Sequence, residues 1–251
     1  MRICIPIVAE TGEEALRKMG RPLPEDRLLE IIFELRMDRM KGVDLQRILR
    51  EKRKKVVVTN RRREEGGGFQ GTEEERIAVI REAVILGADY VDIEASTDHA
   101  LLMEAKALIA AQGHKTMLIV SFHDFEKTPS ERMLRQKLGE CVAWAPDIVK
   151  IASRANTDED NLKSLSLLPY ARRNGQALIS FCMGEKGKIS RVMSLLLGAY
   201  MGFASLSEGE ESALGQLSIA EMLQVLGAVT RENHHIPGKD RIRAGKEILG
   251  V

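Results

Sequence analysis

Residues 147–152 of this 251-residue chain read Asp-Ile-Val-Lys-Ile-Ala, a short run of β-branched and small apolar residues that encloses one lysine. A run of this length is typical of a strand that is buried on both faces, as the strands of a parallel sheet are. Similar runs rich in Val and Ile recur along most of the chain. The predicted strands are residues 2–8, 30–36, 55–61, 90–95, 116–123, 147–153, 177–183 and 202–206.

Segments of helical periodicity separate the predicted strands, which is the signature of repeated βα units. Eight such units predict an α/β fold, a single (β/α)8 TIM barrel that forms one domain over residues 1–230. A doubly wound open sheet is the alternative, but no Gly-x-Gly-x-x-Gly motif follows the first strand. We expect residues 231–251 to form an extension that packs on the barrel or trails from it. The predicted helices are residues 12–19, 45–52, 73–86, 100–112, 129–144, 159–172, 189–199 and 219–230.

The composition excludes several classes of protein. Lys and Arg total 38 against 37 for Asp and Glu, so the chain lacks the positive field that nonspecific nucleic-acid binding needs. Cys4, Cys141 and Cys182 are far apart and odd in number, which argues against a disulfide framework and a metal site. The chain starts with a strand-like run rather than a signal peptide, and no apolar run is long enough to span a membrane. We therefore expect a cytoplasmic protein that binds neither nucleic acid nor membrane.

Lys150 is the lysine inside the apolar run 147–152. Burying an ammonium among Ile, Val and Ala is costly unless its charge is shed or paired. A desolvated lysine amine is a nucleophile, and it commonly forms a Schiff base that turns a carbonyl substrate into an electron sink. A strand-end lysine that reaches into water is the structural alternative.

Polar residues near the carboxyl ends of the predicted strands are the candidate site residues, because a (β/α)8 barrel builds its active site there. Alternation places Glu34, Arg36 and Asp38 on one face of the second strand. This trio is as compatible with a buried ion network as with a ligand contact. A lone strand histidine is more often a satisfied core residue. His123, however, ends the strand before Lys150, where it can exchange protons with a substrate held on that lysine.

Other candidate residues lie in segments that are harder to interpret. Arg61 and Glu65 belong to the charge run 61–65, and most such runs are solvated faces. Arg191 follows the seventh strand, where it is equally compatible with a surface position and with a fork for a substrate carboxylate. Ser212 and Gln216 follow the eighth strand.

Seven motifs in a fixed order identify a family. The chain resembles type I 3-dehydroquinate dehydratase, a Schiff-base enzyme of the shikimate pathway, over nearly the whole predicted barrel. The motifs are Glu34-Leu35-Arg36-x-Asp38, Thr59-x-Arg61 followed by Glu65-Gly66-Gly67, Asp92-Ile93-Glu94, Ser121-x-His123-Asp124-Phe125 with Thr128-Pro129, Asp147-Ile148-Val149-Lys150-Ile151-Ala152, Met183-Gly184 with Ser190-Arg191, and Ser212-x-x-Gly215-Gln216.

The resemblance implies a reaction and roles for the residues. The enzyme would convert 3-dehydroquinate to 3-dehydroshikimate by syn elimination of water, the third step of the shikimate pathway. Lys150 would form the Schiff base with the C3 ketone, His123 would transfer the proton, and Glu65 would orient and tune His123. The resemblance also implies a homodimer with no metal and no organic cofactor. The implied substrate-binding residues are Glu34, Arg36, Arg61, Arg191, Ser212 and Gln216.

Two features depart from the family pattern, and two other functions stay open. Leu214 stands where the family commonly has proline in the loop that covers the substrate, which puts the stiffness of the loop in question. Asn60 and the arginines at 61–63 replace the usual aromatic-arginine pattern. A class I aldolase-like or transaldolase-like enzyme would also use a lysine on the sixth strand. A catalytically silent barrel would bind a shikimate-like ligand, although the presence of both His123 and Lys150 argues against it.

Overall fold

The structure is a computed structural model that describes residues 1–24 and 29–230. Its strands and helices alternate along the chain, as the pattern of apolar runs predicts. The strands are β1 (Arg2–Ile7), β2 (Glu30–Arg36), β3 (Lys55–Thr59), β4 (Tyr90–Glu94), β5 (Met117–Asp124), β6 (Ile148–Arg154), β7 (Ala177–Met183) and β8 (Gly202–Phe203). The helices are α1 (Gly12–Met19), α2 (Leu45–Glu51), α3 (Glu73–Ile85), α4 (His99–Ala111), α5 (Glu131–Val142), α6 (Glu159–Arg173), α7 (Lys188–Leu196) and α8 (Ile219–Thr230).

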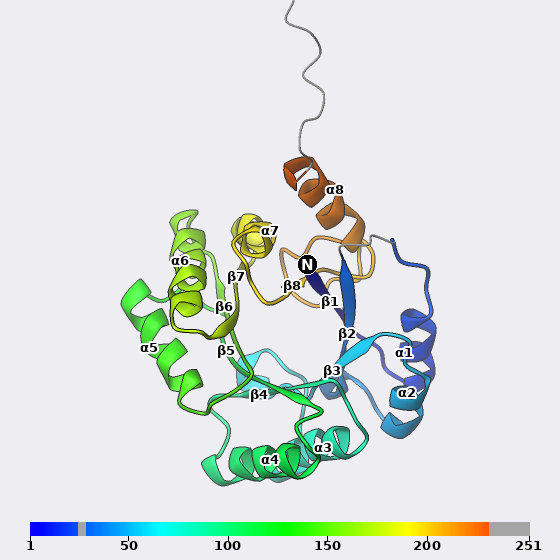
Figure 1. Cartoon of the computed structure of the whole chain (residues 1–251). Coiled ribbons are helices and arrows are strands. Elements are labelled where there is room, and N and C mark those ends of the chain that lie inside the picture. Colours follow the sequence, from blue (N-terminus) through cyan, green and yellow to red (C-terminus); the bar gives the residue numbers. More distant parts are fainter. Residues whose placement is uncertain (25–28, 231–251) are drawn as a thin grey trace, which may run out of the picture.

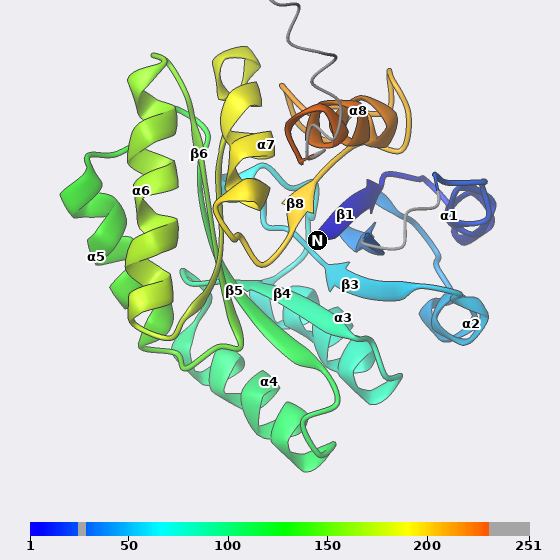
Figure 2. The same ribbon diagram turned by 45° about the horizontal axis from the view of Figure 1, so that its top comes forward.

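The strands form one parallel sheet that curls into a barrel, with helices around its outside (Figures 1 and 2). Their order is β7-β6-β5-β4-β3-β2-β1-β8. The ends of the sheet meet where the N–H of Tyr200, just before β8, donates to the carbonyl of Leu178 in β7 at 2.8 Å. The predicted (β/α)8 TIM barrel is therefore confirmed. The predicted extension, residues 231–251, lies outside the described residues.

Two strands, β3 and β8, are shorter than their apolar runs predict by more than one residue. β3 ends at Thr59 because the chain then turns into a 3-10 helix at Arg63–Glu65. β8 spans two residues because the backbone beyond it pairs with the end of its own loop. Ser205 forms a bridge with Ser218, and its N–H donates to the carbonyl of Leu217 at 2.8 Å.

Alternation along β6 explains why Lys150 points into the barrel. Val149 and Ile151 belong to the larger apolar cluster, which packs between the sheet and the helices. Ile148 and Ala152 belong to a smaller cluster inside the barrel. Because successive side chains of a strand point to opposite faces, Lys150 lies on the inner face between those two residues. The fold therefore places the amine inside the barrel.

Candidate active site

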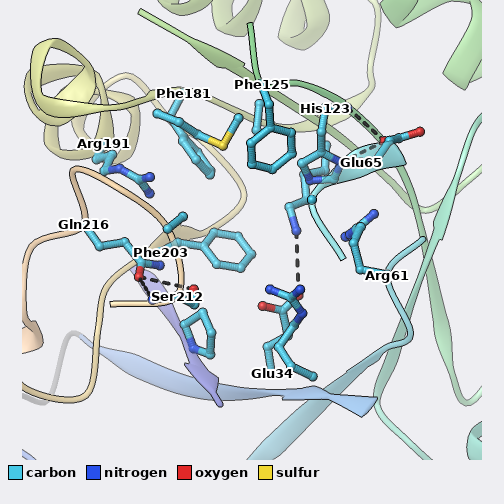
Figure 3. Close-up of a pocket in the computed structure, with 17 residues that line it drawn as sticks. Glu34, Arg61, Glu65, His123, Phe125, Phe181, Arg191, Phe203, Ser212 and Gln216 are labelled. Carbon is cyan, nitrogen blue, oxygen red and sulfur yellow. Dashed lines mark hydrogen bonds and ion pairs between the residues drawn. The ribbon is translucent and has the colours of Figure 1, made fainter. Parts of the chain in front are cut away.

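A pocket opens at the carboxyl ends of the strands, and it brings together all of the residues to which the resemblance assigns a catalytic or substrate-binding role (Figure 3). Phe125, Phe181 and Phe203 supply much of its apolar wall. Within the described residues, no cluster of His, Cys, Asp and Glu is suited to hold a metal ion. The predicted residues that line the pocket are Glu34, Arg36, Arg61, Glu65, His123, Lys150, Arg191, Ser212 and Gln216.

Lys150 is 5% exposed, and its charge is paired inside the pocket. Its Nζ lies 3.0 Å from Oδ2 of Asp92 and 3.7 Å from Oε1 of Glu34. The same nitrogen lies 4.5 Å from the centre of the Phe203 ring. The alternative of a lysine that reaches into water is therefore wrong. Two carboxylates and an aromatic face hold the amine at the bottom of the pocket.

Asp92 is the residue that fixes the lysine. Its Oδ2 also accepts a hydrogen bond from Nη2 of Arg61 at 2.8 Å, and its Oδ1 accepts from Oγ of Ser121 at 2.6 Å. Complete burial alone would raise the pKa of Asp92, but the charges of Arg61 and Lys150 outweigh it and hold that pKa well below the usual range. Asp92 is therefore a permanent carboxylate beside the amine.

His123 and Glu65 form a pair on the next side of the pocket. Oε2 of Glu65 lies 3.0 Å from Nδ1 of His123 and accepts the backbone N–H of the same histidine at 3.0 Å. Oε1 of Glu65 accepts from Oγ of Ser96 at 2.7 Å. A carboxylate at Glu65 can only accept, so this pairing places the proton on Nδ1 and leaves the Nε2 lone pair free.

The electrostatic surroundings favour a neutral imidazole. Burial, and then the nearby charges of Arg61 and Lys150, lower the pKa of His123 well below its ordinary value. Burial raises the pKa of Glu65. His123 is therefore uncharged near neutral pH, which is the state that a general base requires.

Glu34 and Arg36 point from β2 into the pocket, and other residues hold them in place. Oε1 of Glu34 accepts from Oγ1 of Thr59 at 2.7 Å. Nε and Nη2 of Arg36 each donate to a carboxylate oxygen of Asp38 at 2.8 Å. Asp38 does not line the pocket, so both interpretations of this trio apply in part. The ion pair orients the arginine, and the arginine faces the cavity.

Arg61 lines the pocket, but protein groups occupy its terminal nitrogens. Besides Asp92, it donates through Nη1 to Glu94 at 2.9 Å and to Ser121 at 2.7 Å. Its side chain is 4% exposed, and its several carboxylate neighbours raise its pKa despite burial. Its direct contact with a ligand stays a prediction, whereas its contact with Asp92 is visible in the structure.

Arg191 differs from every other cation of the pocket. It is 1% exposed, and no ion pair links it to a carboxylate among the described residues. Its Nη2 donates to the carbonyl of Leu214 at 3.2 Å, and its guanidinium lies 4.7 Å from the Phe181 ring centre, but its Nε finds no acceptor within residues 1–24 and 29–230. Burial without a counter-charge lowers the pKa of Arg191 to about 10. A buried cation of this kind is suited to receive an anionic ligand.

The loop between β8 and α8 closes the remaining side of the pocket. Oε1 of Gln216 accepts from the N–H of Ser212 at 2.7 Å and from its Oγ at 3.2 Å, which directs the amide nitrogen as a free donor. The carbonyl of Leu214 accepts the N–H of Gly184 at 2.9 Å as well as Arg191. Gly215 has φ +75°, and a Cβ there would lie 2.1 Å from the Gly184 oxygen. The loop is thus anchored through its backbone.

Several residues that build the site have no role assigned from the sequence. In the sequence, Asp92 stands out only as part of a motif. A charged residue in a short buried strand is nevertheless itself an indication of a functional role. Phe181 and Phe203 carry no signal, because aromatic residues in strands are usually core residues. Their rings approach each other at 5.7 Å between centres from β7 and β8, which only the folded barrel brings together.

Comparison with known proteins gives one consistent family. The family model described as "Type I 3-dehydroquinase" matches residues 3–233. The chain is 34% identical to 3-dehydroquinate dehydratase of Desulfotalea psychrophila over 88% of this chain and 95% of that protein, and 33% identical to the Methanocaldococcus jannaschii enzyme over 89% and 96%. The solved structure of 3-dehydroquinate dehydratase from Geobacillus kaustophilus is similar with a TM-score of 0.80 at 26% identity, covering 90% of each chain. The Aquifex aeolicus structure gives 0.71 at 29%, covering 92% and 100%.

Proposed function

The chain belongs to the type I 3-dehydroquinase family, and from that membership we propose how the residues of its pocket perform the reaction. The protein is a 3-dehydroquinate dehydratase, a hydro-lyase of the shikimate pathway. Its substrate is 3-dehydroquinate. Family membership favours this function over the aldolase-like enzyme and the silent barrel.

The first step forms a covalent bond at Lys150. Its amine attacks the C3 ketone of 3-dehydroquinate, and loss of water from the adduct gives an iminium. The iminium has the same positive charge as the ammonium that it replaces. Asp92 and Glu34, at 3.0 and 3.7 Å from Nζ, therefore stabilise both states. The iminium makes the C2 hydrogens acidic.

His123 transfers the proton in the second step. Its Nε2 removes a hydrogen from C2, and the resulting imidazolium then protonates the departing C1 hydroxyl, which leaves as water. Use of one residue for both transfers gives a syn elimination. The lowered pKa of His123 supplies the neutral base, and Glu65, 3.0 Å from Nδ1, holds the ring and stabilises the transient imidazolium. Hydrolysis of the iminium releases 3-dehydroshikimate and restores the amine.

The polar groups on the other walls hold the substrate. The substrate carboxylate pairs with Arg191, whose buried guanidinium has no carboxylate partner among the residues that the structure describes. Gln216 donates through its free amide nitrogen from the loop after β8, and Ser212, whose hydroxyl donates to Oε1 of Gln216, lines the pocket beside it. Glu34, Arg36 and Arg61 complete the polar pocket around the remaining hydroxyls. No metal or organic cofactor takes part in these steps.

The observation that supports this mechanism best is the position of a buried, carboxylate-held amine in the same pocket as the His123–Glu65 pair. Mass spectrometry after incubation with 3-dehydroquinate and borohydride tests it. Wild-type protein should gain a substrate-sized adduct that maps to Lys150, and the Lys150→Ala variant should gain none. An adduct on Lys150→Ala, or no adduct on active wild-type protein, would contradict the assignment.

The assembly and location of the enzyme are further proposals. We propose a homodimer, which rests on family resemblance, and light scattering that gives a monomer at micromolar concentration would remove it. We also propose a cytoplasmic location, because Cys4, Cys141 and Cys182 are all buried free thiols. None of the helices in residues 1–24 and 29–230 has both the length and the apolar character needed to cross a bilayer. Cell fractionation tests the location.

A further inference from the structure

We propose that Arg76, on the outer helix α3, is a positioning residue for the reaction. It does not line the pocket, and it acts through Glu94 and Arg61 on the carboxylate that holds the lysine amine. The inference rests on the proposed role of Lys150 as the Schiff-base residue.

The guanidinium of Arg76 is 1% exposed, and each of its N–H groups has an acceptor. Nε and Nη2 donate to the two carboxylate oxygens of Glu73, each at 2.8 Å. Nη1 donates to the carbonyl of Asn60 at 3.0 Å and to Oε2 of Glu94, and Nη2 also donates to Oγ1 of Thr97 at 2.8 Å. Five donors meet five acceptors, so the planar fork has a single orientation.

The local sequence places this fork at the start of α3. Oγ1 of Thr72 accepts the N–H of Glu75, and the Glu75 side chain accepts the N–H of Thr72, a capping box that starts the helix. Arg76 therefore lies in the first turn, beside the carboxyl ends of β3 and β4. The Asn60 side chain donates back to the carbonyl of Arg76 at 3.1 Å. Asn60, one of the departures from the family pattern, thus belongs to this contact.

A continuous row of charges leads from Arg76 to the reactive amine. Glu94 is fully buried, and its two oxygens lie between Arg76 and Arg61. Arg61 then donates through Nη2 to Oδ2 of Asp92 at 2.8 Å. The same oxygen lies 3.0 Å from Nζ of Lys150. Because each charge has partners on both sides, a change at one end alters the balance at the other.

Carboxylates and cations alternate along the row. Three buried carboxylates, on Glu34, Asp92 and Glu94, face the cations of Lys150, Arg61 and Arg76, and the partly exposed Glu73 pairs with Arg76 at the outer end. Loss of Arg76 would remove one positive charge from this row and make it more negative, which favours the ammonium form of the lysine. Attack on the ketone requires the free amine, so imine formation would slow. The titratable groups around the amine are Cys4 on β1, Glu34 on β2, Arg61 on β3, Asp92 on β4 and His123 on β5, with the Phe203 ring on β8.

The Arg76→Met variant tests the proposal. We expect kcat near neutral pH to fall on the order of tenfold, with KM within about twofold of wild type because Arg76 does not reach the pocket. The acid limb of borohydride trapping should move to higher pH. Arg81→Met is the matched control, because Arg81 lies on the same helix in an exposed ion pair with Glu104. Its kcat and pH profile should equal those of wild type.

A second variant separates charge balance from simple loss of packing. The double variant Arg76→Met/Glu94→Gln removes one charge of each sign, so its acid limb should return toward the wild-type position even if its melting temperature stays low. An Arg76→Met enzyme with wild-type kcat and an unchanged acid limb would overturn the proposal. If Arg76→Met does not fold, Arg76→Lys replaces it. Lysine can satisfy at most three of the five acceptors, so kcat should fall several-fold, and an unchanged kcat would again overturn the proposal. Failure of wild-type trapping would instead contradict the role of Lys150.

Discussion

The two sides of the pocket differ in how their charges are paired. On the side formed by β2 to β6, the lysine side, Lys150 lies 3.0 Å from Asp92, which also binds Arg61. On the side formed by β7, α7 and the loop after β8, the arginine side, Arg191 is buried without a carboxylate partner among the described residues. A reaction that moves charge needs surrounding charges that stay balanced throughout. A substrate with a fixed negative charge instead needs a cation that has no carboxylate partner of its own. The difference assigns the chemistry to the lysine side and substrate binding to the arginine side.

The unpaired state of Arg191 has an energetic meaning. A buried charge without a partner costs on the order of several kcal/mol relative to water, even after relaxation. Its contact with Phe181 and its hydrogen bond to the carbonyl of Leu214 offset only part of that cost. A substrate carboxylate would pair with Arg191. Part of the binding free energy would then come from removing the cost of burying that charge, which the protein incurs on folding. The lysine side has no such cost to relieve.

The largest effect should come from Lys150→Ala on the lysine side. Without the amine no iminium forms, and we expect kcat to fall by roughly three orders of magnitude or more. The variant also leaves Asp92 and Glu34 without their ammonium partner, so its melting temperature should fall as well. The absorbance of the conjugated product measures the rate. Wild-type turnover in this variant would contradict the assignment of the chemistry to the lysine side.

His123→Asn should lower kcat by about two to four orders of magnitude, because general acid–base catalysis is lost while the amine remains. Borohydride should still trap the substrate on Lys150. The trapped fraction by mass spectrometry, compared with turnover, separates the two steps. A variant that neither turns over nor traps would show that His123 is required for imine formation, which contradicts a role confined to proton transfer after the iminium has formed.

Arg191→Met on the arginine side should raise KM by about tenfold to a hundredfold and change kcat less, because the arginine binds a carboxylate that does not react. Arg154→Met is a suitable control, since Arg154 lies exposed at the end of β6 near the pocket mouth. Its KM should stay within about twofold of wild type. Equal increases in KM for both variants would indicate general electrostatic attraction rather than a specific site.

Acid should destabilise the protein through His123. Its pKa in the folded state lies well below the ordinary value of 6.5, so below pH 6.5 the unfolded chain binds more protons than the folded one. Stability is therefore lost as pH falls, by up to about 1 kcal/mol from this group over the first pH unit. Melting temperatures between about pH 7.5 and 5.5 should fall more steeply for wild type than for His123→Asn. The raised pKa of Glu65 has the opposite effect on stability, at pH values nearer the ordinary range of a carboxyl. Equal slopes of melting temperature against pH for wild type and His123→Asn would contradict the assignment to His123.

The smallest effect should come from Leu214→Pro in the loop of the arginine side. The Leu214 side chain is 69% exposed, and the loop is anchored by the carbonyl of this residue, which proline keeps. We expect KM to stay within about threefold of wild type. A tenfold fall in KM would show that a stiffer loop binds better and that leucine limits this enzyme.

Much of the lysine side could be predicted from local pattern. Apolar runs located the strands, one of these runs singled out Lys150, and alternation placed Glu34 and Arg36 on one face. Motif order then grouped His123 and Glu65 with the lysine, and the structure brings them together. The inferences from pattern succeeded because they depend on a period of two along one strand and on the end at which a barrel forms its site, whereas the role of Glu65 came from the family resemblance.

The partners of these residues could not be predicted in the same way. The contact between Arg76 and Glu94 joins α3 to β4, and its existence depends on how the helix docks, which spacing along the chain does not give. The shortness of β8 arises from a bridge between Ser205 and Ser218 at the two ends of one loop. That Arg191 has no carboxylate partner in the described part of the chain is likewise a property of packed neighbours. Sequence identified the charged residues, and only the fold decided which of them are paired.

Parallel measurement of kcat and KM for His123→Asn and Arg191→Met tests the division of the pocket most directly. We predict that His123→Asn loses activity almost entirely in kcat and that Arg191→Met loses it mainly in KM. Both variants should still be trapped on Lys150 at saturating substrate. A large loss of kcat with unchanged KM in Arg191→Met would contradict the division, because the unpaired arginine would then act on the reacting atoms rather than on the bound carboxylate.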